Sequence, residues 1–235
     1  MRTILVVLML ALSLSNAAGQ QDAELIAARA ARDRGSVAEL QRLVTKSRQK
    51  AGRSRDSDAY TRLALLHMWM CEAIESNENK VLFKKTAQAG VAAAEKAVAL
   101  NPQSSDAHWL LGDLLNQLIP HVYGGGMRYG QRANAELDRA ITLNPRNANA
   151  YVSRAISYHY TPESFGGSKT KASEFLKKAA ELDSSADTPH IWLALFHMEA
   201  QDKEAAMREI TIALNANPNR AFTRFVSEQV KAMKG

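Results

Sequence analysis

The same helix terminator recurs along the chain at a nearly regular interval. Leu-Asn-Pro stands at residues 100–102 and 143–145, Leu-Asp-Ser takes that place at 182–184, and Asn-Pro follows at 217–218. Proline after a helix stops it. The last interval, 34 residues, is the length of a helix–turn–helix unit, and the earlier intervals of 43 and 39 residues fit that length plus insertions. Because apolar residues recur three and four apart between these stops, we predict an all-α chain of repeated helix pairs.

Small and large residues alternate at fixed positions within each predicted pair. Each second helix has a small residue, then an aliphatic residue or alanine four positions later, and then an alanine three positions after that. They are Gly90, Ala94 and Ala97; Ala133, Leu137 and Ala140; Ala172, Leu176 and Ala179; and Ala206, Ile210 and Ala213. In the first helices, a small residue stands between two larger ones. They are Tyr60, Ala64 and His67; His108, Gly112 and Leu115; Tyr151, Ala155 and Tyr158; and His190, Ala194 and His197.

This pattern resembles the tetratricopeptide-repeat (TPR) family. The resemblance implies a right-handed α-solenoid of about four helix pairs between Asp56 and Pro218. Residues 219–234 are expected to form a helix that caps the last apolar face, so the array with its cap spans 56–235. A preceding helix pair and a polar linker are expected over residues 20–55. The four histidines at large positions are expected to pack between paired helices.

The first 19 residues have the layout of a secretory signal peptide. Arg2 precedes an apolar stretch from Ile4 to Leu14, and small residues follow up to Gly19. The stretch is shorter than the roughly 20 residues of a membrane-spanning helix. We therefore expect an exported protein, periplasmic or secreted, that is soluble after cleavage; an uncleaved anchor is the alternative.

An insertion of the form Pro-x-x-aromatic-Gly-Gly follows the first helix in two successive repeats. Its conspicuous residues are Tyr123, Gly124 and Gly125 in the second repeat and Phe165, Gly166 and Gly167 in the third. Proline ends the helix, glycine permits a positive φ, and the aromatic ring is expected to tuck back as a plug. Either these are elongated loops without a ligand or they line one rim of the array. The insertion also resembles one found in TPR proteins of the kind to which the periplasmic T component of TRAP-type transporters belongs. This resemblance implies a hydrophobic channel that faces a substrate-binding partner.

The concave groove of the array is predicted to be apolar. In TPR proteins the first helices line it, and the corresponding positions include all three tryptophans of the chain. We take the binding residues to be Trp69, Trp109, Asn116, Ile156, His159, Ile191, Trp192 and Leu195. Such a groove suits a protein partner or a small hydrophobic ligand, unless the protein's own terminal helices fill it. His159 is expected on the exposed side of its helix.

Signatures of catalysis and of metal binding are missing from the sequence. Cys71 is the only cysteine and lies mid-helix, which favours a buried, inert thiol. The histidines lack a His-x-x-x-His pair, and Gly124, Gly126 and Gly130 follow a helix rather than the strand that a dinucleotide fingerprint needs. Six basic residues between Leu40 and Arg55 lack interleaved aromatic residues, so we interpret them as a solvated face rather than a nucleic-acid site.

The functional expectation is an exported, non-catalytic TPR scaffold that binds a partner protein through its groove. It needs no cofactor or metal, contacts no nucleic acid, and leaves self-association into a homo-oligomer open. The alternative is an accessory or carrier component of a TRAP-type solute transporter that holds a small hydrophobic ligand.

Overall fold

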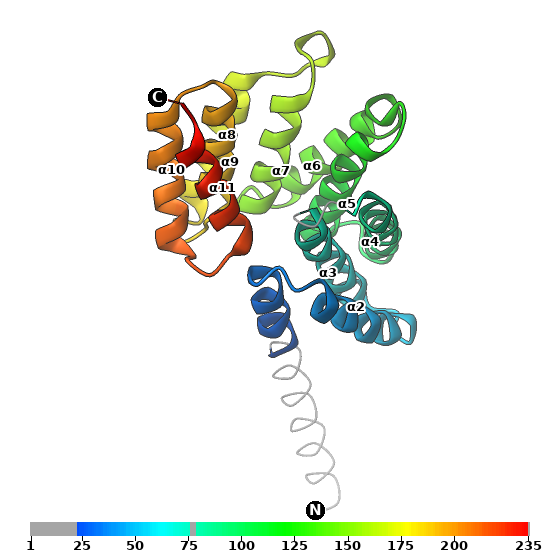
Figure 1. Ribbon diagram of the computed structural model, residues 1–235. Helices are drawn as coiled ribbons and strands as arrows, with labels where there is room; N and C mark the ends of the chain where they lie inside the picture. Colours follow the sequence, from blue (N-terminus) through cyan, green and yellow to red (C-terminus); the bar gives the residue numbers. More distant parts are fainter. Residues whose placement is uncertain (1–22, 76–78, 235) are drawn as a thin grey trace, which may run out of the picture.

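In the computed structural model, residues 23–75 and 79–234 are described, and every regular element among them is a helix. The predicted signal peptide lies outside these residues. Four antiparallel pairs follow one another along the array. They are α3 (Ser57–Glu75) with α4 (Lys80–Leu100), α5 (Ser105–Leu118) with α6 (Gln131–Leu143), α7 (Ala148–Tyr160) with α8 (Lys169–Leu182), and α9 (Thr188–Glu199) with α10 (Lys203–Ala216). The predicted α-solenoid of four TPR-type pairs is thus confirmed (Figure 1).

An Asn or Asp side chain ends the second helix in every repeat. Each is the C-cap residue, with φ between −139° and −145°, and its side-chain oxygen accepts a hydrogen bond from the backbone N–H two residues on. The acceptors are Asn101, Asn144, Asp183 and Asn217, with N···O distances of 3.1, 3.0, 3.1 and 3.3 Å. This local turn competes with the helix for the backbone donor, which explains why the terminator recurs at this place.

The small residues let the helices of a pair approach closely. A Cβ atom on Gly112 would lie 2.6 Å from Leu137 Cγ and 2.9 Å from the carbonyl oxygen of Ala133, both in the partner helix. Ala155 and Ala194, at the same position in later repeats, are fully buried. The expected packing role of the small residues is therefore confirmed.

Two of the four histidines at large positions pair with an acid of their partner helix. His108 Nδ1 lies 2.5 Å from Glu136, and His190 Nδ1 lies 2.7 Å from Glu209. In the third repeat Tyr151 packs against Phe175 in the corresponding place, with ring centroids 5.3 Å apart. These histidines lie between paired helices as predicted, but through a polar contact that the sequence pattern did not indicate.

Helices at both ends extend the array. Residues 23–33 are helical and precede α2 (Val37–Gly52), and α11 (Ala221–Ala232) covers α9 and α10 at the other end. The two ends meet: a Cβ on Gly35 would lie 3.6 Å from Ala221 Cβ at the start of α11. In Figure 1 the blue N-terminal helix lies below the loop that leads into the red α11.

Candidate functional site

The first helices of the pairs form the inner face of the array. The helices α3, α5, α7 and α9 contact one another in succession, and each second helix packs behind its own first helix. All eight predicted groove residues belong to these four helices. Trp69, Trp109 and Ile191 are buried, the side chain of His159 is nearly so, and Asn116, Ile156, Trp192 and Leu195 are partly exposed.

The protein's own residues cover the first part of the inner face. Trp69 on α3 is buried, with the guanidinium of Arg32 from the N-terminal helix 5.4 Å from its ring centroid. Trp109 on α5 donates its Nε1–H to Ser153 Oγ on α7 at 3.0 Å. These two tryptophans therefore pack between helices, because neighbouring elements reach over the positions that the repeat pattern leaves open.

A polar cluster lies on α5 next to Trp109. Asp113 Oδ1 accepts a hydrogen bond from Ser153 Oγ at 2.6 Å, and Asp113 Oδ2 accepts one from Gln117 Nε2 at 2.7 Å. Burial raises the pKa of Asp113, and these two hydrogen bonds only partly offset that rise. Gln117 Oε1 and Asn116 Nδ2 are buried and have no hydrogen-bond partner in the described part of the chain. Such atoms carry an unrelieved desolvation cost in the folded protein.

An aromatic cluster occupies the inner face between α7 and α9. His159 stacks on Phe196 with ring centroids 3.6 Å apart, and its side chain is only 5% exposed. The expectation that His159 lies on an exposed surface was therefore wrong, because α9 packs over it. Glu199 accepts hydrogen bonds from His159 Nε2 and Tyr160 Oη, each at 2.7 Å. Burial would raise the pKa of Glu199, but these two bonds and the charges of His159 and Lys169 together outweigh it and lower the pKa.

An arginine joins the two ends of the array. The Arg220 guanidinium, in a side chain 5% exposed, donates to both carboxylate oxygens of Glu72 on α3, at 2.8 and 2.7 Å. It also donates to Asp187 at 2.9 Å and to Thr188 at 2.8 Å, beside the start of α9. Burial would lower the pKa of Arg220, but the two carboxylates more than compensate and raise it. Sequence reasoning missed this cluster, because its members lie up to 148 residues apart and belong to no motif.

The two Gly-Gly insertions share two features of their backbone. Gly124 and Gly166 have φ of +66° and +89°, as expected for glycine at a sharp turn. The second glycine of each insertion lies against the end of the first helix. A Cβ atom on Gly125 would lie 2.3 Å from the carbonyl oxygen of Ile119, and one on Gly167 would lie 1.7 Å from the carbonyl oxygen of Thr161. Both glycines are therefore required by the backbone.

The aromatic residues of these insertions point away from the fold. Tyr123 is fully exposed, and Phe165 is 79% exposed. The expectation that these rings plug the helix ends was thus wrong, because the glycines already bring the loop backbone against the helix. Figure 1 shows both loops, between α5 and α6 and between α7 and α8, on the same upper rim.

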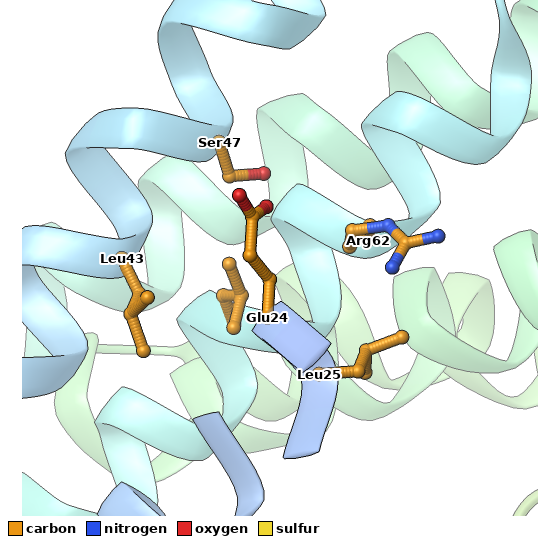
Figure 2. Close-up of a pocket in the computed structure, with 6 residues that line it drawn as sticks. Glu24, Leu25, Leu43, Ser47 and Arg62 are labelled. Atoms are coloured by element: carbon orange, nitrogen blue, oxygen red, sulfur yellow. The ribbon is translucent and has the colours of Figure 1, made fainter. Parts of the chain in front are cut away.

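A small hollow lies apart from the inner face, between the N-terminal helix, α2 and α3 (Figure 2). It is lined by Glu24, Leu25, Leu43, Ser47, Arg62 and Leu66. Lys46 and Lys50 each lie within 2.8 Å of the Glu24 carboxylate. Burial would raise the pKa of Glu24, but these lysines outweigh it and lower the pKa. The hollow holds about one water molecule at most, so we assign it no ligand.

Two further features concern the described residues as a whole. Among residues 23–75 and 79–234, no three His, Cys, Asp or Glu side chains are grouped so that they could hold a metal ion. Over the same ranges no helix combines the length and apolar character needed to span a bilayer. The thiol of Cys71 is buried, as predicted.

Comparisons with known proteins bear on the fold. Neither the protein-family models nor the curated protein sequences include a match to this chain. Among solved structures, TTC0263, a thermophilic TPR protein of Thermus thermophilus, superposes with a TM-score of 0.55 at 18% identity, over 83% of this chain and 99% of that one. YrrB, a TPR protein with an unusual peptide-binding site, gives 0.45 at 12% identity, over 83% and 93%. MamA from Desulfovibrio magneticus RS-1 gives 0.47 at 16% identity, over 78% and 89%. The TTC0263 superposition, together with the four helix pairs, shows that this chain has the tetratricopeptide-repeat fold.

Proposed function

We propose that this protein is an exported, non-catalytic scaffold that docks a partner protein on the inner face of its second to fourth repeats. The observation that carries the proposal is the partial exposure of three apolar residues on the adjacent helices α7 and α9, namely Ile156, Trp192 and Leu195. On α5, which contacts α7, Asn116 Nδ2 and Gln117 Oε1 have no hydrogen-bond partner among the described residues. Apolar contact area next to a few unsatisfied polar groups is what a peptide segment or helix needs for a specific complex.

The two Gly-Gly loops extend this surface at the upper rim. Tyr123 and Phe165 are exposed aromatic residues on one edge of the array, and aromatic side chains are enriched where proteins bind one another. We therefore include both loops, with their glycines, in the proposed docking surface. Self-association through these rings is a second use of the same rim.

A second candidate function is the accessory component of a TRAP-type solute transporter. It is favoured by the repeated aromatic-Gly-Gly insertion, and it requires the inner face to hold a small hydrophobic ligand. The partly exposed Trp192 reports on both cases, since its fluorescence changes when its surroundings lose water. A change on adding small apolar molecules, without a protein partner, supports the carrier; a change only with a partner protein supports the scaffold.

Site-specific photo-crosslinking tests where the partner docks. A photoreactive phenylalanine analogue replaces Leu195 on the inner face in one variant and Ile212 on α10 in the other. Ile212 is the matched control, because it is an exposed apolar residue on a second helix. We expect a discrete crosslinked species, in cells that export the protein, from the Leu195 position only. Equal crosslinking from both positions, or none from Leu195, would contradict the proposal.

A further inference from the structure

The charges of the array separate between its two layers. The four first helices contain two basic and six acidic residues, whereas the four second helices contain twelve basic and seven acidic residues. The helices α5 and α9 contain no lysine or arginine, and Arg154 of α7 is bound to Asp138 on α6. In a chain of formal net charge +6, the first helices of the last three repeats thus carry three carboxylates, Asp106, Asp113 and Glu199, and one arginine.

Asp113 is the central carboxylate of this face. Both groups that hydrogen-bond it in the described part of the chain, Ser153 and Gln117, are uncharged. Glu72 on α3 acts on it as a second negative charge. A carboxylate in such surroundings gains more from a bound ammonium or guanidinium group than one in water does.

Arg220 is a cation that carboxylates on or beside the first helices already bind. It enters from the far end of the chain, and its guanidinium is almost completely enclosed by Glu72, Asp187 and Thr188. Its aliphatic stem belongs to the same buried side chain. The fold thus already binds one arginine across its ends, by carboxylates on or beside the first helices.

We infer that the segment docked on the inner face is cationic: it places a lysine or arginine side chain against Asp113 while its apolar residues cover Ile156, Trp192 and Leu195. This inference rests on the proposed docking function and names its partner class. Glu199, at the C-terminal end of α9, supplies a second carboxylate for a further basic residue, next to the ring of Tyr160, whose hydroxyl it binds. Cations over such rings are further stabilised by the negative face of the aromatic system.

Peptide display on the full-length mature protein tests the inference. A library of random short peptides is selected against the wild type, and the enriched peptide is then synthesised with a counterpart in which each Lys and Arg is replaced by Gln. Affinities of both are measured by calorimetry for the wild type, Asp113→Asn and Glu199→Gln. Glu204→Gln is the matched control, because Glu204 is an exposed carboxylate on the second helix α10. Asp113→Asn keeps the shape of the side chain, and a melting curve verifies its fold.

We expect enrichment of peptides that combine apolar residues with lysine or arginine. The enriched peptide should bind about tenfold more weakly to Asp113→Asn than to the wild type, and its affinity should fall as salt rises. Glu204→Gln should bind like the wild type, and the Gln counterpart should be insensitive to Asp113→Asn. Enriched peptides that are acidic or uncharged, or equal losses for both peptides, would overturn the inference. If Leu195 still crosslinks a partner in that case, the docking function stands and only its charge preference fails; a selection that enriches nothing overturns both.

Discussion

Replacing Arg220 should destabilise the protein far more than replacing an exposed arginine does. Its guanidinium makes two hydrogen bonds to Glu72, one to Asp187 and one to Thr188, in a side chain 5% exposed. In Arg220→Met the stem is kept, but both carboxylates lose their cation. Removing one partner of a buried ion pair costs about 3–5 kcal/mol, because the remaining charge stays buried and uncompensated. For a chain of this size, that loss lowers the melting temperature by roughly 6–20 °C.

Arg224→Met is the matched control for this experiment. Arg224 lies one turn further along α11, is exposed, and donates one hydrogen bond to the carbonyl oxygen of Pro218. Thermal and urea unfolding, followed by circular dichroism, should show less than about 0.5 kcal/mol for this variant. Adding Glu72→Gln and Asp187→Asn to Arg220→Met should recover part of the loss, since no buried charge then remains. If Arg220→Met were as stable as Arg224→Met, the closure of the array by this ion cluster would be refuted.

Three further outcomes follow from the structure. Gly167→Ala should lower the free energy of unfolding in urea by about 2 kcal/mol or more, because its Cβ would lie 1.7 Å from the Thr161 carbonyl oxygen. Gly126→Ala should be neutral, because a Cβ there would meet nothing within 4 Å; equal effects of the two changes would contradict the steric requirement for glycine at residue 167. Burial lowers the pKa of His67 from 6.5 to about 4, so on acidification the unfolded chain binds the proton before the folded chain does. The contribution of the neutral His67 to stability should therefore be complete above pH 6.5 and fall by up to about 3 kcal/mol towards pH 4, and His67→Leu should not show this loss. Trp109→Ala should cost about 3–5 kcal/mol in the same assay, as for a buried aromatic residue, and a cost below about 1 kcal/mol would mean that Trp109 is not packed as described.

The candidate site was predictable in its helices but not in its accessible residues. Repeat register placed all eight predicted residues on α3, α5, α7 and α9, because register depends on spacing within one pair. It could not place Arg32 over Trp69, nor α9 over His159, because those contacts join different pairs. The proposed docking surface therefore includes the partly exposed Ile156, whereas Trp69 of the first repeat is buried in the core.

The sequence by itself determined the helix pairs, their stops and the glycine turns of the inserted loops. These features rest on interactions within a few residues or within one pair: the Asn101-type turn on the N–H two residues on, the close approach at Gly112, and the glycine backbone at Gly166. Only the tertiary structure decided that the ends of the array meet. Small rotations between successive pairs add up along the array until Arg220 lies against Glu72, 148 residues away in the sequence. No pattern within a single repeat predicts the total rotation.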